Sequence, residues 1–196
     1  MKTNLKPRPA LAFTLIEMVG VLAVIALLSG ILVPKVLAAI DNARIEHTIS
    51  SLNAVKSATM GYFNKYGRFG EIGGGLLTTS GTNWDRVLVA ENFLARPFDS
   101  RVGERPQIQV MRITETPSPG VDGCFTLTAK NEDKLRSGSV VVLATLANVS
   151  LSDARELSWR IDGDALSATD PTRADALGRV TYPAGGGTVA MYINHQ

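Results

Sequence analysis

The chain is poor in the residues that build many catalytic and metal sites. It has one cysteine, Cys124, and two histidines, His47 and His195. A single cysteine excludes an internal disulfide and any zinc or iron–sulfur site that needs several thiolates. Neither histidine has a second ligand at metal-binding spacing, and we expect Cys124 to be a small buried residue in a strand. Because no Gly-x-Ser-x-Gly motif is present and no Gly-Lys-Ser/Thr follows the glycines at 73–75, we expect no enzyme activity.

An excess of charge of one sign is also missing. The 196 residues include 20 Lys+Arg and 18 Asp+Glu, for a formal net charge of +2. Arg96, Arg101 and Arg105 form a modest basic cluster, but Asp99 and Glu104 interrupt it. Nucleic-acid binders usually carry a continuous basic surface, so nucleic-acid binding is not expected. With 45% hydrophobic and 19% charged residues, the chain has the composition of a folded domain.

The apolar residues are concentrated near the N-terminus. Residues 11–40 are apolar at 23 of 30 positions, and residues 13–33 carry one charge, Glu17. As a helix, residues 13–33 span about 30 Å, the thickness of the hydrocarbon core of a bilayer. Residues 1–12 form a basic leader with Lys2, Lys6 and Arg8 and no acid, which favours a cytoplasmic N-terminus.

Two ordinary explanations of this segment leave Glu17 unexplained. A cleavable secretory signal, cut after residues 36–38, has a shorter apolar core than this one. A plain membrane anchor has the right length but gives no reason for a carboxylate, which costs about 3 kcal/mol at the centre of a membrane span and less near its end.

Residues 12–18 read Ala-Phe-Thr-Leu-Ile-Glu-Met. This stretch resembles the processing motif of type IV prepilins and type II secretion pseudopilins. In that family a basic leader is removed before an apolar residue, the new N-terminus is methylated, and glutamate is the fifth mature residue. A cut between Ala12 and Phe13 gives these positions to Phe13 and Glu17, although the family usually has glycine at the place of Ala12. Pro34 matches the proline at which the family's helix bends.

The processed N-terminus offers Glu17 a partner. A cationic α-amino group on Phe13 and the Glu17 carboxylate cost less together than apart at the edge of an apolar phase. The two residues are one helical turn apart, so they are able to pair within one chain. The resemblance implies a second arrangement, in which Glu17 of an incoming subunit pairs with the amino group of a neighbour. Glu17 then sets the register of assembly, as a buried polar residue does in a coiled coil.

Beyond Pro34 the apolar pattern becomes amphipathic. Residues on one predicted helical face recur every three or four positions: Ile45, Ile49, Leu52, Val55, Thr59, Tyr62 and Tyr66. We therefore predict one helix over residues 13–66, with a membrane-spanning and assembly part at 13–40 and an amphipathic continuation at 41–66. The predicted fold class is α+β, with this long helix packed on a small antiparallel sheet. The resemblance implies the same pilin-like layout.

Residues 67–196 are predicted to form a globular, pilin-like β-sheet domain. Alternating apolar runs predict strands at 107–114, 124–129, 140–146, 180–182 and 188–193. Glycine- and proline-rich stretches predict turns at 117–123, 131–138 and 185–187. Two short helices are predicted, one over 84–94 with Asn83 as N-cap and one over 154–161 with Asp153 as N-cap. Trp84 and Trp159 are expected to pack in the core or at the sheet edge.

Three acidic residues are weak calcium candidates. Asp162, Asp164 and Asp170 lie close together in the sequence, and Asp-x-Asp is a fair start for a calcium loop. The remaining EF-hand positions do not fit, because Leu166 offers no side-chain oxygen and Arg173 replaces the final glutamate. Some pseudopilins hold calcium in their C-terminal loops, but we expect turn or capping acids here, and no cofactor.

The sequence therefore favours a structural subunit of a type IV pilus or a type II secretion pseudopilus. The resemblance implies three partners: a prepilin peptidase, an inner-membrane assembly platform, and further copies or other pilin-like subunits. It also implies a single-pass protein of the bacterial inner membrane with its C-terminal domain in the periplasm, later moved into the filament. A membrane-tethered enzyme or binding module and a DNA-uptake pilin remain the alternatives. Loss of the leader leaves 17 basic against 18 acidic residues.

Overall fold

The computed structural model describes residues 13–71, 73, 83–113, 125, 138–167, 170 and 173–196. The chain forms two compact units, which divide inside the first helix between Asn42 and Ala43. Cys124, most of the predicted strand at 124–129 and nearly all of the turns predicted at 117–123 and 131–138 lie outside the described residues.

The first helix, α1, comprises Leu15–Tyr66 and confirms the helix predicted over 13–66. It ends where the backbone of Gly67 turns to a φ of 69°, a left-handed conformation that glycine adopts at little cost. The N–H of Gly67 still donates to the carbonyl of Phe63 at 2.7 Å, which closes the last turn. The helix therefore stops at the first of the glycines that follow it.

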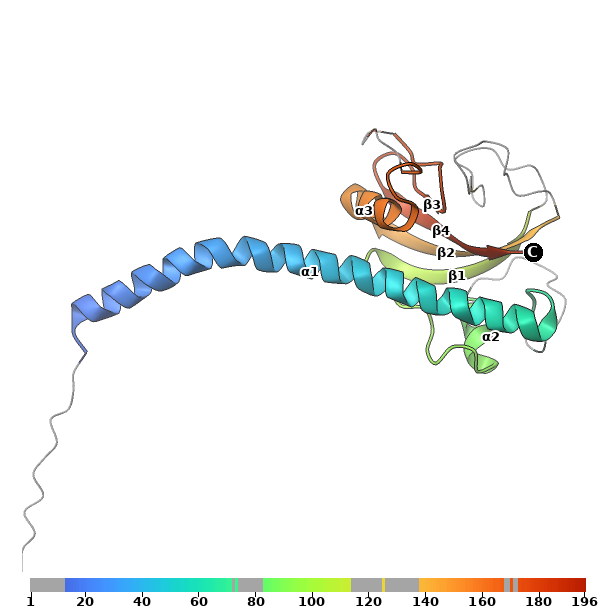
Figure 1. Cartoon of the computed structure of the whole chain (residues 1–196), viewed down its shortest axis with the longest axis horizontal. Helices are drawn as coiled ribbons and strands as arrows, with labels where there is room; N and C mark the ends of the chain where they lie inside the picture. Colours follow the sequence, from blue (N-terminus) through green and yellow to red (C-terminus); the bar gives the residue numbers. More distant parts are fainter. Residues whose placement is uncertain are drawn as a thin grey trace, which may run out of the picture. The chain divides into compact units, whose positions relative to one another are not determined.

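The described strands form one antiparallel sheet in the order β1-β2-β4-β3. The strands are β1 (Glu104–Arg112), β2 (Val140–Val149), β3 (Val180–Thr181) and β4 (Gly187–His195). β2 lies between β1 and β4 and is apolar along most of its length, as expected of a strand covered on both faces. This sheet, with the long N-terminal helix, confirms the α+β class with a pilin-like layout (Figure 1).

One face of the sheet packs against the part of α1 that belongs to the second unit (Figure 1). The buried residues of this helix face are Ile45, Thr48, Leu52, Val55, Ala58, Thr59 and Tyr62. They share one core with inward-facing residues of the strands, among them Ile108, Val142 and Met191. The predicted helix face is confirmed, and Thr48 and Ala58 extend it.

The opposite face of the sheet carries a smaller apolar cluster. It consists of Ile113, Phe125, Val141, Leu143 and Ala190, with Met111 and Tyr192 packed against it. Because side chains alternate along a strand, Val141 and Leu143 point away from α1 while their neighbours in β2 point toward it. The predicted glycine loop at 185–187 also forms, and all three glycines have positive φ, the last of them being the first residue of β4.

Two predictions for the short helices are wrong in their caps. The helix α2 is only Asp85–Ala90, and no side chain caps its start, so Asn83 is not an N-cap. Its end is set by Asn92, whose φ of 61° turns the chain out of the helix. The helix α3, Leu151–Asp162, begins three residues before the predicted start at 154, and its N-cap is Ser150 rather than Asp153. The hydroxyl of Ser150 accepts from the N–H of Asp153.

Candidate functional site

The first part of α1 presents apolar side chains on all sides. Every described residue from 13 to 44 is exposed, and Leu15 and Ile16 are 81% and 75% exposed. This helix is long and apolar enough to cross a membrane, and it lies near the N-terminus. A helix that is apolar all round is stable only in apolar surroundings, which are a lipid bilayer or a bundle of similar helices.

Thr14 and Glu17 form a capping box at the start of this helix. Glu17 Oε2 accepts hydrogen bonds from the backbone N–H of Thr14 at 3.0 Å and from its hydroxyl at 2.8 Å. The hydroxyl oxygen of Thr14 in turn accepts from the N–H of Glu17 at 3.3 Å. The two side chains thus satisfy backbone donors that the first turn of a helix leaves unpaired. Thr-x-x-Glu is the sequence signal for this motif, so the box was predictable from residues 14–17 alone.

The residues predicted for processing and assembly lie at or before this first turn. Phe13 precedes α1 with its side chain 73% exposed, whereas Ala12 lies outside the described residues. The second carboxylate oxygen of Glu17, Oε1, makes no hydrogen bond to any other described residue. Glu17 therefore caps its own helix with one oxygen, while the other has no hydrogen-bond partner in the part of the chain that the structure describes.

Pro34 lies inside α1, and the helix continues on both sides of it. Proline has no N–H, so the carbonyl of Gly30 loses its usual helical donor, which is the common cause of a bend. The bend itself stays a prediction. A Cβ added at Gly20 or Gly30 would meet nothing within 4 Å, so both glycines face open space where another helix has room to approach.

Asp162, the first calcium candidate, already has a cation. Its side chain is fully buried, and Oδ1 pairs with the guanidinium Nε of Arg179 at 3.2 Å. Its Oδ2 accepts from the N–H groups of Arg179 at 2.9 Å and Val180 at 2.8 Å. Burial raises the pKa of Asp162 above its ordinary value, while these hydrogen bonds and the guanidinium act in the opposite direction. Asp162 thus holds the end of α3 to the start of β3.

The other two candidates point to separate partners. Asp164 accepts a hydrogen bond from the indole N–H of Trp159, and Asp170 pairs with Arg173 at 3.4 Å. Within the described ranges, no three His, Cys, Asp or Glu side chains come together at a place able to hold a metal ion. Trp84 is buried, as predicted, whereas Trp159 is 53% exposed and lies outside the core, so of the two places predicted for Trp159 the core is wrong.

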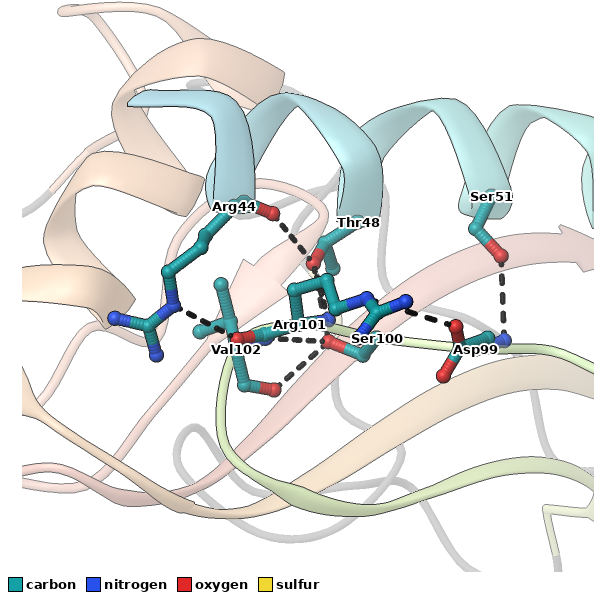
Figure 2. A network of polar contacts seen from close by, with 7 residues as sticks. All are labelled: Arg44, Thr48, Ser51, Asp99, Ser100, Arg101 and Val102. Atoms are coloured by element: carbon teal, nitrogen blue, oxygen red, sulfur yellow. Dashed lines mark hydrogen bonds and ion pairs between the residues drawn. The ribbon is translucent and has the colours of Figure 1, made fainter. Parts of the chain in front are cut away.

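A polar network fastens the connector before β1 to α1 (Figure 2). The hydroxyl of Thr48, which is fully buried, donates to the carbonyl of Arg44 at 3.1 Å and accepts from the N–H of Arg101 at 3.3 Å. It also lies 3.0 Å from the Ser100 hydroxyl, which donates to the carbonyl of Val102 at 2.8 Å. The sequence prediction missed Thr48 because its spacing went from Ile45 directly to Ile49.

The same network accounts for part of the predicted basic cluster. The guanidinium Nε of Arg44 donates to the carbonyl of Arg101 at 3.0 Å, and the side chain of Arg101 lies 4.0 Å from Asp99 (Figure 2). Arg105, the second residue of β1, has a φ of 47° and lines a hollow on the sheet face opposite α1. Arg101 and Arg105 thus lie in different surroundings and do not form one continuous basic surface.

Glu91, which follows α2, joins three parts of the second unit. Its carboxylate accepts from the Tyr66 hydroxyl at 2.5 Å, from the Gly73 N–H at 2.7 Å and from Lys65 Nζ at 3.2 Å. The Tyr66 hydroxyl, with the Gly73 N–H and the Lys65 ammonium, lowers the pKa of Glu91. The last turn of α1 and the chain just beyond it are therefore held to the end of α2.

Comparison of the chain with protein-family models, with curated proteins and with solved structures finds no match.

Proposed function

We propose that the chain is a structural subunit of a type IV pilus or a type II secretion pseudopilus. In this proposal a prepilin peptidase cuts the membrane-anchored precursor between Ala12 and Phe13, and the amino group of Phe13 is methylated. The mature chain then assembles with further copies or other pilin-like subunits. The observation that carries the proposal is the contrast within α1: its part from Ala43 on belongs to a folded core, whereas residues 13–42 present apolar side chains on every side.

The free-energy cost of exposing residues 13–42 to water favours two successive apolar environments for this part of the helix. Each exposed apolar side chain of residues 13–42 costs free energy in water, at about 25 cal/mol per Å² of apolar surface. The bilayer removes this cost before assembly, and neighbouring helices remove it afterwards. A helix of this kind does not leave the membrane alone, which is why the proposal includes an inner-membrane assembly platform.

The basic leader supports the orientation of the precursor. Lys2, Lys6 and Arg8 precede the apolar segment and no acid accompanies them, so the N-terminus is expected to stay in the cytoplasm. The proposal therefore assigns the chain to the bacterial inner membrane as a single-pass protein. Its second unit faces the periplasm until the subunit enters the filament.

The geometry of Glu17 supports a role for its charge beyond capping. A capping box needs a hydrogen-bond acceptor at this position, and a neutral glutamine serves as well as glutamate. A carboxylate at the edge of the membrane is the more expensive choice. In the proposal, Oε1 of Glu17 pairs with the α-amino group of Phe13 of a neighbouring subunit, and this ion pair offsets the free-energy cost of the charge.

Three substitutions separate the capping role from the charge role. Glu17→Gln keeps the box and removes the charge, Glu17→Ala removes both, and Thr14→Ala weakens the box and keeps the charge. We expect all three variants to insert in the membrane, measured by their resistance to alkaline extraction. In cells that carry the assembly machinery, Thr14→Ala should form filaments visible by electron microscopy, whereas both Glu17 variants should not. Normal filaments from Glu17→Gln would contradict the role of the charge.

A further inference from the structure

A cleft of about 530 Å³ lies beside α3. Its volume falls within the range of about 300–1,000 Å³ that is typical of small-molecule sites. One stripe of α3 lines one side through Ser152, Arg155, Glu156 and Trp159, which follow the spacing of a single helical face. The chain after α3 contributes Asp164 and Ser167. The cleft belongs entirely to the second unit, so it does not depend on the membrane segment.

Trp159 is the unusual residue of this cleft. Its side chain is 53% exposed, although tryptophan has one of the largest apolar surfaces of any residue. The indole N–H donates to Asp164, so the ring is held at its polar edge while about half of the residue's surface stays exposed. A tryptophan ring fixed at one edge is a preformed stacking surface, and its electron-rich face attracts the weakly positive C–H groups of a ligand.

The polar groups around the ring are of mixed character. Arg155 supplies donors, and the carboxylates of Glu156 and Asp164 supply acceptors. Glu156 uses Oε1 for Arg160, at 2.6 Å, and Asp164 uses Oδ1 for the indole. A strongly charged ligand would meet a group of its own sign here, and an apolar ligand would leave these groups unpaired. A ligand with hydroxyl groups, which both donate and accept, satisfies donors and acceptors together.

We propose that this cleft binds a neutral saccharide, with the C–H face of one sugar ring stacked on Trp159. The hydroxyls at the edge of the ring then donate to the carboxylates of Glu156 and Asp164 and accept from the guanidinium of Arg155. This binding activity is separate from filament assembly: it needs neither processing at Phe13 nor the charge of Glu17.

The test uses the full chain in nanodiscs of phosphatidylethanolamine and phosphatidylglycerol, which contain no sugar. Saturation-transfer NMR is recorded with glucose, galactose, N-acetylglucosamine and their disaccharides, and with choline as a cationic probe. We expect saturation transfer to the C–H protons of at least one sugar and none to choline. The same sugar should protect the exposed tryptophan from acrylamide quenching. Trp84, which is buried, is the internal reference that acrylamide does not reach.

Two variants locate the binding. Trp159→Ala should weaken the binding of that sugar about tenfold or more, since the stacking surface is lost. Met60→Ala removes an exposed apolar side chain of similar accessibility, 46%, that does not line the cleft, and it should leave the affinity unchanged. Circular dichroism confirms that each variant is folded. Transfer to choline alone, transfer to no sugar, or a Trp159→Ala variant that binds as well as the parent would overturn the proposal.

Discussion

The buried carboxylate of Asp162 and the partly exposed guanidinium of Arg179 form an ion pair that joins the end of α3 to the start of β3. The Asp162 side chain is completely buried, and the Arg179 Nε lies 3.2 Å from its Oδ1. The same carboxylate accepts two backbone N–H groups at the start of β3. The guanidinium of Arg179 therefore lies beside the carboxylate that the sequence suggested as a calcium ligand. The contacts of Asp162 with Arg179 and Val180 thus hold α3 to β3 in the C-terminal part of the chain.

Removing the guanidinium should destabilise the second unit. Arg179→Ala leaves the Asp162 carboxylate buried without its cation, so the group either stays charged at a cost or takes up a proton. We expect a loss of about 2–3 kcal/mol in the free energy of unfolding. The measurement is urea unfolding of the full chain in nanodiscs, followed by tryptophan fluorescence. Arg173→Ala is the matched control, because Arg173 pairs with Asp170 while 82% exposed, and it should change stability by less than about 1 kcal/mol.

The buried hydroxyl of Thr48 should matter more than its methyl group. Thr48→Val keeps the shape of the side chain but leaves the N–H of Arg101 without its acceptor, which we expect to cost about 1–3 kcal/mol of unfolding free energy. Thr59→Val is the control: Thr59 is equally buried, but the hydrogen bond that its hydroxyl makes within the described residues goes to the Lys56 carbonyl of its own helix. Equal losses in the two variants would show that the contact to Arg101 contributes nothing.

Glu91 should make the stability of the second unit depend on pH. Its hydrogen bonds lower its pKa in the folded chain, so the ionised form binds better when the chain is folded. The stabilisation is therefore present above the pKa of an unfolded glutamate, about 4.3, and is lost as the pH falls through the lower folded value. Glu91→Gln should lower the melting temperature at pH 7 and have a smaller effect at pH 3. A difference that is the same at both pH values would contradict this account.

Much of the helical part of the fold was predictable because local sequence determines it. A long, mostly apolar segment and a regular spacing of apolar residues beyond it predicted α1 from end to end, and Gly67 marked its end. The central strand β2 was clear for the same reason, since residues covered on both faces read as a continuous apolar run. At the start of α3, by contrast, Ser150, Ser152 and Asp153 are all good capping residues, and local sequence does not decide among them.

The contacts that organise the second unit were not predictable, because they join residues distant in the sequence. Asp162 and Arg179 are 17 positions apart, Tyr66 and Glu91 are 25, and Thr48 and Arg101 are 53. Such pairs leave no periodic signal, and a charged residue in a loop looks the same whether it is solvated or buried. The exposure of Trp159 was missed for a related reason: tryptophan usually packs, and only the fold shows that the described residues leave about half of it exposed.

The central claim is that the chain is processed between Ala12 and Phe13 and carried into a filament by the exposed apolar helix. The most direct test is the mass and sequence of the N-terminal peptide of the chain extracted from membranes of its own cells. The account predicts a peptide that begins with N-methylated Phe13. An intact Met1 would contradict processing, and a chain that begins at Ala39 would instead identify a cleaved secretory signal.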